Sequence, residues 1–439
     1  MNPPEDAYTF VRERESSART YANAVPRVLE RGRLTRIHDT DGNSYLDCLT
    51  VAGTLALGHN HPVVTARVRE YLDSGQMQQA LDFTTPAKHA FLRTLYRHLP
   101  PGFAATAKVQ FCGPSGADAA EAAVKLFKSA TGRRTVLTFH GAYHGMTAGA
   151  LSLTGNLRAK ERVASLMPDV HFLPYPYAYR CPFGLGEPQG STVGLHYIER
   201  VLTDPESGIT RPAAVIVEAV QGEGGVVPAP VEWLRGLRAI TAALDVPLVV
   251  DEIQSGVGRT GTMFAFEAAG IEPDAILMSK AVGGGFPLSL VLYHERYDGW
   301  LPGSHAGTFR GNQLGMVAGA ATLDVIEAEG LVAAAATKGA LLGDLLKDLA
   351  HRHPEIGEVR GRGLMWGLEI VDPQGRPDAL GSLPADGART TALKRRCLEN
   401  GLLTESGGRH GAVLRLLPPL TITEEEITEL ADRLEKSFD

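Results

Sequence analysis

The sequence from 275 to 287 is Ala275-Ile276-Leu277-Met278-Ser279-Lys280-Ala281-Val282-Gly283-Gly284-Gly285-Phe286-Pro287. The apolar run before Lys280 predicts a short buried strand, and the glycines after it predict a tight turn with room close to the backbone. Burial at a strand end lowers the pKa of a lysine and favours its neutral, nucleophilic amine. On this stretch alone, an ordinary solvated lysine is the simpler interpretation. The role of Lys280 therefore depends on the groups that the rest of the chain brings to it.

The composition is that of a globular protein with more than one domain. Of its 439 residues, 44% are hydrophobic and 21% are charged, which supplies enough core for two or three domains. The net charge is -7 and no basic stripe is present, so we expect no nucleic-acid partner. No apolar run approaches the about 20 residues that span a bilayer, and the N-terminus lacks the features of a signal peptide. We expect no membrane partner.

Cysteines and histidines give no metal signature. The cysteines at 48, 112, 181 and 397 are scattered and form no CxxC pair, which predicts reduced thiols in a cytoplasmic protein. His59 and His61 lie two residues apart, but no further ligand cluster follows them. Pro62 instead favours the start of a helix at this point. We therefore expect no metal site.

The order of predicted elements divides the chain into three parts. Residues 1–55 form an N-terminal segment that packs with the small domain; it includes a helix-compatible stretch at 13–19 and a hairpin at Asp41-Gly42-Asn43. Residues 56–320 form the large domain. Residues 321–439 form a smaller α+β domain. It is helical to 350, with short strands at 363–370 and 413–417 and a last helix at 424–436.

Strands and helices alternate in the large domain. The predicted strands are 108–112, 135–139, 214–220, 247–253 and 275–278, and the helices between them include 118–129 and 232–244. This alternation predicts an α/β fold with a mostly parallel sheet that helices cover on both faces. Residues 160–210 are rich in proline, tyrosine and glycine, so we expect them to form a long irregular excursion on the surface.

Ligands of open α/β sheets bind at the carboxyl ends of the strands, so the residues that follow each strand are site candidates. Strand 108–112 is followed by Gly113-Pro114-Ser115-Gly116-Ala117-Asp118, which leads into a predicted helix. Free N–H groups and the dipole at a helix start favour an anion such as phosphate. Ser115 and Asp118 also match a capping box, which is compatible with a phosphate site.

Three further strand ends carry an aromatic ring or carboxylates. In His140-Gly141-Ala142-Tyr143-His144-Gly145, the glycines leave Tyr143 free to stack on a heterocycle, with core filling as the alternative. Glu218 lies inside strand 214–220, and Glu223 follows that strand. Asp251 ends a buried strand, where a carboxylate requires a partner or becomes protonated. That partner is either a structural cation or a protonated ring nitrogen.

Together these strand ends supply what pyridoxal 5'-phosphate (PLP) requires from a protein. PLP needs a grip on its phosphate, a stacking partner for its ring, a counter-charge for its pyridine nitrogen and an amine for a Schiff base. Each signal is weak alone, and their combination favours a PLP site built around Lys280.

With these motifs, the sequence resembles the class III (ω-amino acid) aminotransferases of PLP fold type I. The resemblance runs from His59 to the C-terminus, with the motifs in the family order. The carrying residues are 113–116, Tyr143-His144-Gly145, 218–225, 251–256, Lys280 and Gly307-Thr308. Within the class, the stretches 305–313 and 414–422 are most similar to the diaminobutyrate:2-oxoglutarate aminotransferases.

The resemblance implies a role for each site residue. Lys280 would form the Schiff base and then move a proton between the substrate carbon and the cofactor. Asp251 would keep the pyridine nitrogen protonated. The further cofactor contacts would be Ser115, Gly116 and Ala117 on the phosphate, Tyr143 and Ile253 on the two ring faces, Gln254 on the phenolic oxygen, and Glu218. Thr308 would reach the phosphate of the neighbouring subunit, which implies a homodimer.

The resemblance also implies how two unlike substrates share one site. Arg415 lies in an apolar strand, and an arginine there suits bidentate binding of a substrate carboxylate. Glu223 would pair with Arg415 while an ω-amine is bound and swing away for 2-oxoglutarate or glutamate. The alternative for this pair is a permanent structural salt bridge.

The leading hypothesis is a transaminase that moves the terminal amino group between L-2,4-diaminobutyrate and 2-oxoglutarate, giving aspartate 4-semialdehyde and glutamate in either direction. An ornithine- or 4-aminobutyrate-type enzyme shares these motifs, so the sequence leaves the chain length of the amino donor open. A fold type I racemase or mutase is a further alternative, but it needs no glutamate-binding arginine. A PLP-sensing regulator would need a DNA-binding extension, for which the lead-in residues leave no room.

Overall fold

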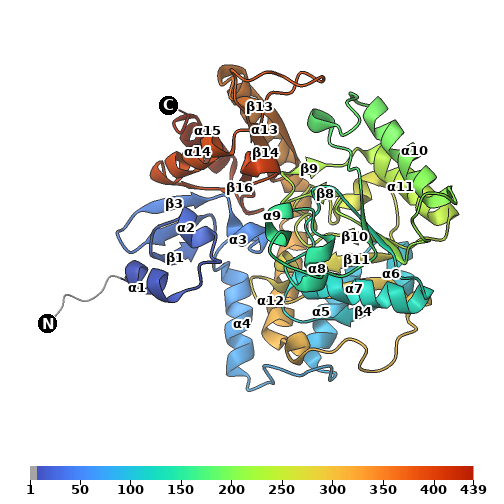
Figure 1. Ribbon diagram of the computed structural model, residues 1–439. Coiled ribbons are helices and arrows are strands. Elements are labelled where there is room, and N and C mark those ends of the chain that lie inside the picture. The colour runs from blue at the N-terminus through green and yellow to red at the C-terminus, as the bar shows by residue number, and fades with distance from the viewer. Residues whose placement is uncertain (1–6, 439) are drawn as a thin grey trace.

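The computed structural model describes residues 7–438 and is built around one mixed sheet (Figure 1). The sheet has seven strands in the order β4-β12-β11-β10-β7-β5-β6. Their bounds are β4 Ala107–Phe111, β12 Leu290–His294, β11 Ala275–Met278, β10 Leu248–Asp251, β7 Ala214–Val217, β5 Val136–Phe139 and β6 Val170–Leu173. Every neighbouring pair in this sheet is parallel except those that involve β12. The predicted α/β class with a mostly parallel sheet is confirmed.

The central strands are buried at every position, as expected where helices cover both faces of a sheet. The helices of this part of the chain are α4 Pro62–Asp73, α5 Pro86–Arg97, α6 Pro101–Thr106, α7 Gly116–Thr131, α8 Ala148–Leu153, α9 Leu157–Lys160, α10 Gln189–Thr203, α11 Val231–Ala243 and α12 Gln313–Ala328. Helix α7 buries a row of alanines against the sheet, which permits a close approach of its backbone. The predicted helix start at Pro62 is confirmed.

The predicted surface excursion at 160–210 is wrong. This part of the chain contains β6, an edge strand of the central sheet, and the helix α10. Glycines inside α10 concealed it, because glycine weakens a helical pattern. They are there for packing: a Cβ at Gly190 would lie 2.8 Å from the sulfur of Cys181, and one at Gly194 would touch the ring of Phe183 at 3.4 Å.

Two smaller sheets join residues from distant parts of the sequence. The first is β1 Leu29–Arg33, β2 Arg36–Asp39, β3 Ser44–Asp47 and β15 Leu402–Leu403. The predicted hairpin between β2 and β3 is confirmed, and β3 pairs in parallel with β15 near the C-terminus. The helix predicted at 13–19 is wrong in its bounds, because α1 covers Ala7–Arg14; the helices α2 Tyr21–Ala24 and α3 Thr50–Gly53 follow.

The second small sheet has the strand order β13-β14-β17-β16. Its bounds are β13 Ile356–Arg362, β14 Met365–Ile370, β17 Val413–Leu416 and β16 Glu405–Gly407, and its helices are α13 Leu331–Arg352, α14 Gly387–Glu399 and α15 Glu424–Glu435. Helix α13 packs on both α15 and β13. Figure 1 shows the red C-terminal helices α14 and α15 above the blue N-terminal strands β1 and β3, to the left of the large sheet.

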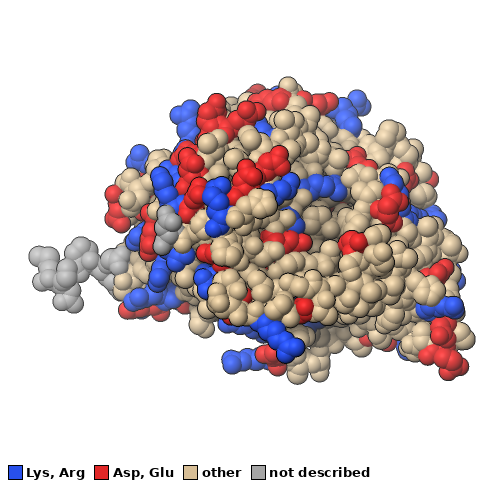
Figure 2. Space-filling view, turned by 90° about the horizontal axis from the view of Figure 1, so that it is seen from above, with Lys and Arg blue, Asp and Glu red and all other residues tan. Residues whose placement is uncertain are grey.

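The surface carries charges of both signs. On the face in Figure 2, acidic and basic side chains are interspersed, with neutral areas between them. No helix within residues 7–438 has the length and apolar character that a membrane span requires.

Candidate active site

The strand ends converge on a cavity of about 430 Å³. Its lining contains the predicted site residues Ser115, Gly116, Ala117, Tyr143, Glu218, Glu223, Asp251, Ile253, Gln254 and Lys280. Arg415 forms an ion pair with Glu223, which lines the cavity. Thr308 lies on the surface outside the cavity. The structure therefore brings together all the residues predicted from strand ends, although they are spread over more than 160 positions from Ser115 to Lys280.

Lys280 follows β11 and begins the 3-10 helix η3 (Lys280–Gly283). Its backbone has a φ of 49°, in the left-handed region that costs a side-chain-bearing residue energy. The turn that follows requires glycine, because a Cβ at Gly284 would lie 2.4 Å from the carbonyl oxygen of Ala318. Burial lowers the pKa of Lys280, and the charges of Glu223 and Asp251 oppose this only in part. The amine is thus shifted toward its neutral, nucleophilic form.

The turn between β4 and α7 lies where the anion cradle was predicted. Gly116 and Ala117 begin α7, where backbone N–H groups have no partner within the helix. The predicted capping box is wrong: Ser115 makes no side-chain cap, and the carboxylate of Asp118 instead accepts the N–H of Gly113. The hydroxyl of Ser115 thereby stays available to a ligand. A Cβ at Gly116 would lie 2.8 Å from Cδ1 of Ile253, so only glycine fits between the cradle and that side chain.

Asp251 has a partner that the sequence did not suggest. Nδ1 of His144 lies 2.7 Å from Oδ2 of Asp251, and both side chains are buried. Burial disfavours charge on His144, but the hydrogen bond and the charge of Asp251 outweigh it and raise the pKa of His144. The other carboxylate oxygen of Asp251 accepts the N–H of Ile253 at 3.0 Å. These bonds hold the carboxylate at the end of β10, where it lines the cavity.

Glu218 positions the aromatic loop. It does not lie inside a strand as predicted, because β7 ends at Val217 and the short strand β8 (Val220–Gln221) begins after it. Its carboxylate accepts the N–H groups of Tyr143 and Gly222, each at 2.9 Å. Burial, reinforced by the nearby charge of Asp251, raises the pKa of Glu218 to about 7. The ring of Tyr143 is half-buried at the cavity wall, as a stacking role requires.

Gln254 and Glu223 connect the cavity to Arg415. Nη2 of Arg415 bonds Oε1 of Glu223 at 2.8 Å, and its Nη1 lies 3.5 Å from Oε1 of Gln254. The amide nitrogen of Gln254 donates to the carbonyl oxygen of Ala52 at 3.1 Å. Burial raises the pKa of Glu223, but Arg415 overcomes this effect and lowers it, so the pair is ionised. Tyr21 also lies near: burial and the charges of Glu405 and Glu223 raise its pKa, and sequence reasoning missed it.

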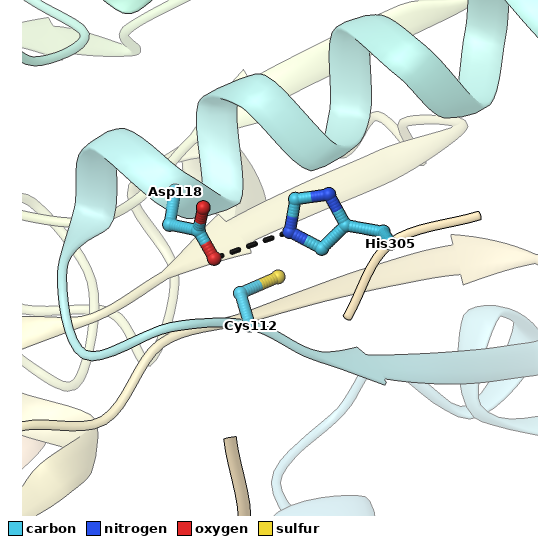
Figure 3. Close-up of side chains that lie close together, drawn as sticks. All are labelled: Cys112, Asp118 and His305. Carbon is cyan, nitrogen blue, oxygen red and sulfur yellow. Dashed lines mark hydrogen bonds and ion pairs between the residues drawn. The ribbon is translucent and has the colours of Figure 1, made fainter. Parts of the chain in front are cut away.

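Thr308 lies on the 3-10 helix η5 (Thr308–Gly311), on the surface. The preceding loop is tied to the phosphate cradle, because Nε2 of His305 lies 3.1 Å from Oδ2 of Asp118 at the start of α7. Figure 3 shows this pair beside the thiol of Cys112, which lies at the end of β4.

Cys112, Asp118 and His305 are the group within residues 7–438 whose potential metal-ligand atoms come within 4.8 Å of one another. The hydrogen bond from His305 lowers the pKa of Asp118, whose Oδ2 also accepts the N–H of Gly113. Burial raises the pKa of the Cys112 thiol and so favours its protonated form. These hydrogen bonds connect the loop that contains His305 to the start of α7.

The residues present fit PLP. The cradle offers helix N–H groups and a free hydroxyl for the phosphate, the glycine at 116 leaves room that a Cβ would fill, and Asp251 offers a carboxylate for a protonated ring nitrogen. Lys280 supplies the amine from the same cavity.

The fold and this cavity are those of a PLP-dependent transaminase of fold type I. The model of the family Aminotransferase class-III matches residues 16–438, and the chain belongs to that family.

Two relatives share about half of their residues with this chain over nearly its full length. A diaminobutyrate--2-oxoglutarate aminotransferase from Rhizobium meliloti (strain 1021) is 54% identical over 97% of this chain and 91% of its own. One from Haemophilus influenzae (strain KW20) is 48% identical over 96% of this chain and 92% of its own.

Solved structures agree with the fold. An amine transaminase from an uncultivated Pseudomonas species, in the PLP-bound form, is 30% identical and superposes with a TM-score of 0.85 over 97% of both chains. A thermostable omega transaminase mutant from Pseudomonas jessenii is 24% identical and shares the fold with a TM-score of 0.87, over 99% of this chain and 98% of its own.

Proposed function

We propose that this transaminase moves the terminal amino group between L-2,4-diaminobutyrate and 2-oxoglutarate, giving aspartate 4-semialdehyde and glutamate in either direction. The observation that carries the proposal is the ionised Glu223–Arg415 pair at the wall of the cavity that holds Lys280. If Glu223 can leave the buried Arg415, one site can bind the amine end of one substrate and the carboxylate end of the other in turn. The names of the relatives at 54% and 48% identity support this choice of substrates.

PLP, when bound, supplies an electron sink that stabilises negative charge on the substrate carbon. In the proposal, Ser115, Gly116 and Ala117 hold its phosphate, and Tyr143 and Ile253 enclose its ring. Asp251, fixed by His144, faces the ring nitrogen, and Glu218 sets the position of the loop that carries Tyr143. Gln254 reaches the phenolic oxygen by exchanging its contact with Ala52.

Lys280 is the proposed nucleophile and proton carrier. Its lowered pKa makes the neutral amine accessible, which both roles require. The carboxylates of Glu223 and Asp251 oppose the effect of burial on the pKa of Lys280, so the amine keeps part of its affinity for a proton.

We also propose a homodimer in which Thr308 reaches the neighbouring active site. The segment around Leu81 lies against η5, since the N–H of Ala80 bonds the carbonyl oxygen of Gly311 and Arg310 bonds Asp82 at 2.6 Å. Exposed apolar side chains gather on these two segments: Met77, Leu81, Phe83 and Phe309. Such a patch is typical of a surface that another chain covers.

The reduced cysteines support a cytoplasmic location. The division into an N-terminal segment at 1–55, a large domain at 56–320 and a small domain at 321–439 is part of the same proposal. The pairing of β3 with β15 supports it, because the first segment completes a sheet with the last one.

To test the proposed reaction, single amines are added to the purified, PLP-loaded protein and the absorbance of the cofactor is followed. We expect diaminobutyrate and glutamate each to convert the cofactor to its pyridoxamine form. Faster conversion by ornithine or 4-aminobutyrate than by diaminobutyrate would assign a different donor. Racemisation of the amino acid without conversion would replace transamination by a racemase, and conversion by neither diaminobutyrate nor glutamate would refute the proposal.

A further inference from the structure

Two neighbouring buried side chains of the small sheet each keep one polar atom without a hydrogen-bond partner. Arg415 on β17 and Glu405 on β16 are directly opposite each other in the antiparallel register. Arg415 is 0% exposed and Glu405 is 6% exposed. Nε of Arg415 lacks an acceptor, and Oε2 of Glu405 lacks a donor. Buried polar groups are rarely left unpaired, so a complementary donor and acceptor on facing residues require an explanation.

The remaining polar atoms of both side chains are engaged elsewhere. Oε1 of Glu405 accepts the N–H of Ser406 at 2.7 Å and lies 3.2 Å from Nζ of Lys394. The guanidinium of Arg415 contacts Glu223 and Gln254 through its two terminal nitrogens. The donor and the acceptor that remain lie on facing residues of β16 and β17, and Tyr21 is a further neighbour of the Glu405 carboxylate.

The proposed exchange of Glu223 makes such a second bond necessary. Removing one partner of a buried ion pair leaves an uncompensated charge, which is strongly unfavourable. Burial lowers the pKa of Arg415, and the charges of Glu223 and Glu405 together reverse this effect. Once Glu223 moves away, Glu405 is the carboxylate that remains. On the other neighbouring strand, the residue opposite Arg415 is Gly367, which has no side chain.

The space beside Nε of Arg415 is kept clear by a glycine. A Cβ at Gly407, two residues after Glu405, would lie 2.8 Å from that nitrogen. Any larger residue there would press on the guanidinium and hinder its movement. The site thus has the room as well as the unpaired atoms for a second arrangement.

We propose that Glu405 is the alternate partner of Arg415: when Glu223 leaves, Oε2 of Glu405 accepts the Nε–H, and Nη2, which Glu223 releases, becomes free for the carboxylate of 2-oxoglutarate or glutamate. This inference rests on the Glu223–Arg415 exchange of the proposed function. Glu405 is a positioning residue, since it acts through Arg415. It should matter for the dicarboxylate half-reaction and not for the diamine half-reaction.

The test measures the two half-reactions separately on PLP-loaded Glu405→Gln. We expect the apparent dissociation constant for glutamate to rise about tenfold or more, because a charge-assisted bond is lost, while that for diaminobutyrate changes less than about twofold. Binding of glutarate, a dicarboxylate that cannot react, should weaken in parallel. Glu405→Asp keeps the charge and should recover part of the affinity. Glu399→Gln, an exposed glutamate on α14, is the matched control.

The outcomes distinguish a positioning role of Glu405 from a structural role. Unchanged glutamate and glutarate binding in Glu405→Gln would overturn the inference and leave the proposed function intact. Equal losses in both half-reactions, with no recovery in Glu405→Asp, would also overturn it, because they indicate a structural role. Failure of the wild-type protein to react with glutamate would overturn both the inference and the proposed function.

Discussion

Lys280 combines two unfavourable features at one residue: a left-handed backbone and a buried amine, whose burial two nearby carboxylates offset only in part. Glycine and asparagine tolerate that backbone better than lysine does. The strain therefore supports a chemical role for the side chain.

Lys280→Ala should lower turnover by at least about 10³-fold, since it removes both the nucleophile and the proton carrier. Cofactor binding should persist, because the cradle at Ser115 and the ring contacts are unchanged. Steady-state kinetics and the absorbance of the bound cofactor measure the two effects. Lys347→Ala, at a side chain that is 57% exposed, is the control. Multiple turnovers by Lys280→Ala at the wild-type rate would exclude the assignment.

Glu252 follows Asp251 in the sequence and is buried. Burial raises the pKa of Glu252 to about 7, so the native state holds its proton more tightly than the unfolded chain does. Its contribution to stability is full below the ordinary pKa of 4.5 and is lost as pH rises through about 7. Glu252→Gln removes this titration while keeping the size of the side chain.

The stability of Glu252→Gln relative to wild type should therefore increase between pH 4.5 and 8, by up to about 3 kcal/mol. Urea unfolding of the cofactor-free protein at several pH values measures this difference. Glu399→Gln serves again as the exposed control. Parallel stability profiles for Glu252→Gln and wild type would show that the carboxylate is ionised without penalty.

At the residue scale, the sequence was sufficient to predict the site residues that follow strands. It was not sufficient to predict which residues they bond. Lys280 and Asp251 could be found because each lies at the end of an apolar run, and Tyr143 because it lies in the glycine-flanked loop after one. His144 could not be paired with Asp251, because a contact between residues 107 positions apart depends on strand order. Glu405 carried no sequence signal either, since its importance follows from the register of β16 with β17.

The β4–α7 turn is the element that determines how the phosphate would be held. Gly116 lies where a Cβ would meet Ile253 at 2.8 Å. Gly116→Ala should push Ile253 toward the ring position and raise the dissociation constant for PLP about tenfold, which corresponds to about 1.4 kcal/mol. Fluorescence titration of the cofactor-free protein measures this change. Gly186→Ala, where a Cβ meets nothing within 4 Å, should bind PLP as wild type does. Equal affinities for Gly116→Ala and wild type would contradict the tight fit.

At the element scale, prediction succeeded where apolar runs are continuous and failed where packing overrides local pattern. The strands β10 and β11 were recognisable because they are buried on both faces. Helix α10 was missed because its glycines serve close contacts with Cys181 and Phe183. The strand β12 was missed because a turn of six residues returns it directly from η3, without the helix that parallel strands require.

At the scale of the whole molecule, the property to be tested is the oligomeric state. The exposed ring of Phe309 lies next to Thr308 and is 57% exposed. Phe309→Asp should convert the proposed dimer to a monomer, because a carboxylate cannot be buried in that interface without a partner. Turnover should fall with it, since Thr308 would no longer reach the neighbouring site.

Analytical ultracentrifugation and activity measured on the same samples test this prediction. Val193→Asp introduces the same charge at an exposed position on α10, and that variant should remain dimeric and active. A Phe309→Asp protein that stays dimeric, or a monomer with full activity, would be evidence against the proposed assembly. The sequence alone could suggest the dimer only by resemblance, because exposed apolar residues become a patch only after folding.

One consequence follows from the antiparallel strand β12. Phe111, Leu290 and Met278 form a single row across β4, β12 and β11, and the cradle and Lys280 each begin just after this row. Two strand spacings, together about 10 Å, therefore separate the proposed anchor of the cofactor's phosphate from the amine. Backbone hydrogen bonds maintain that interval, and they do not depend on side-chain identity. Mutations in loops that do not line the cavity should consequently leave this interval unchanged.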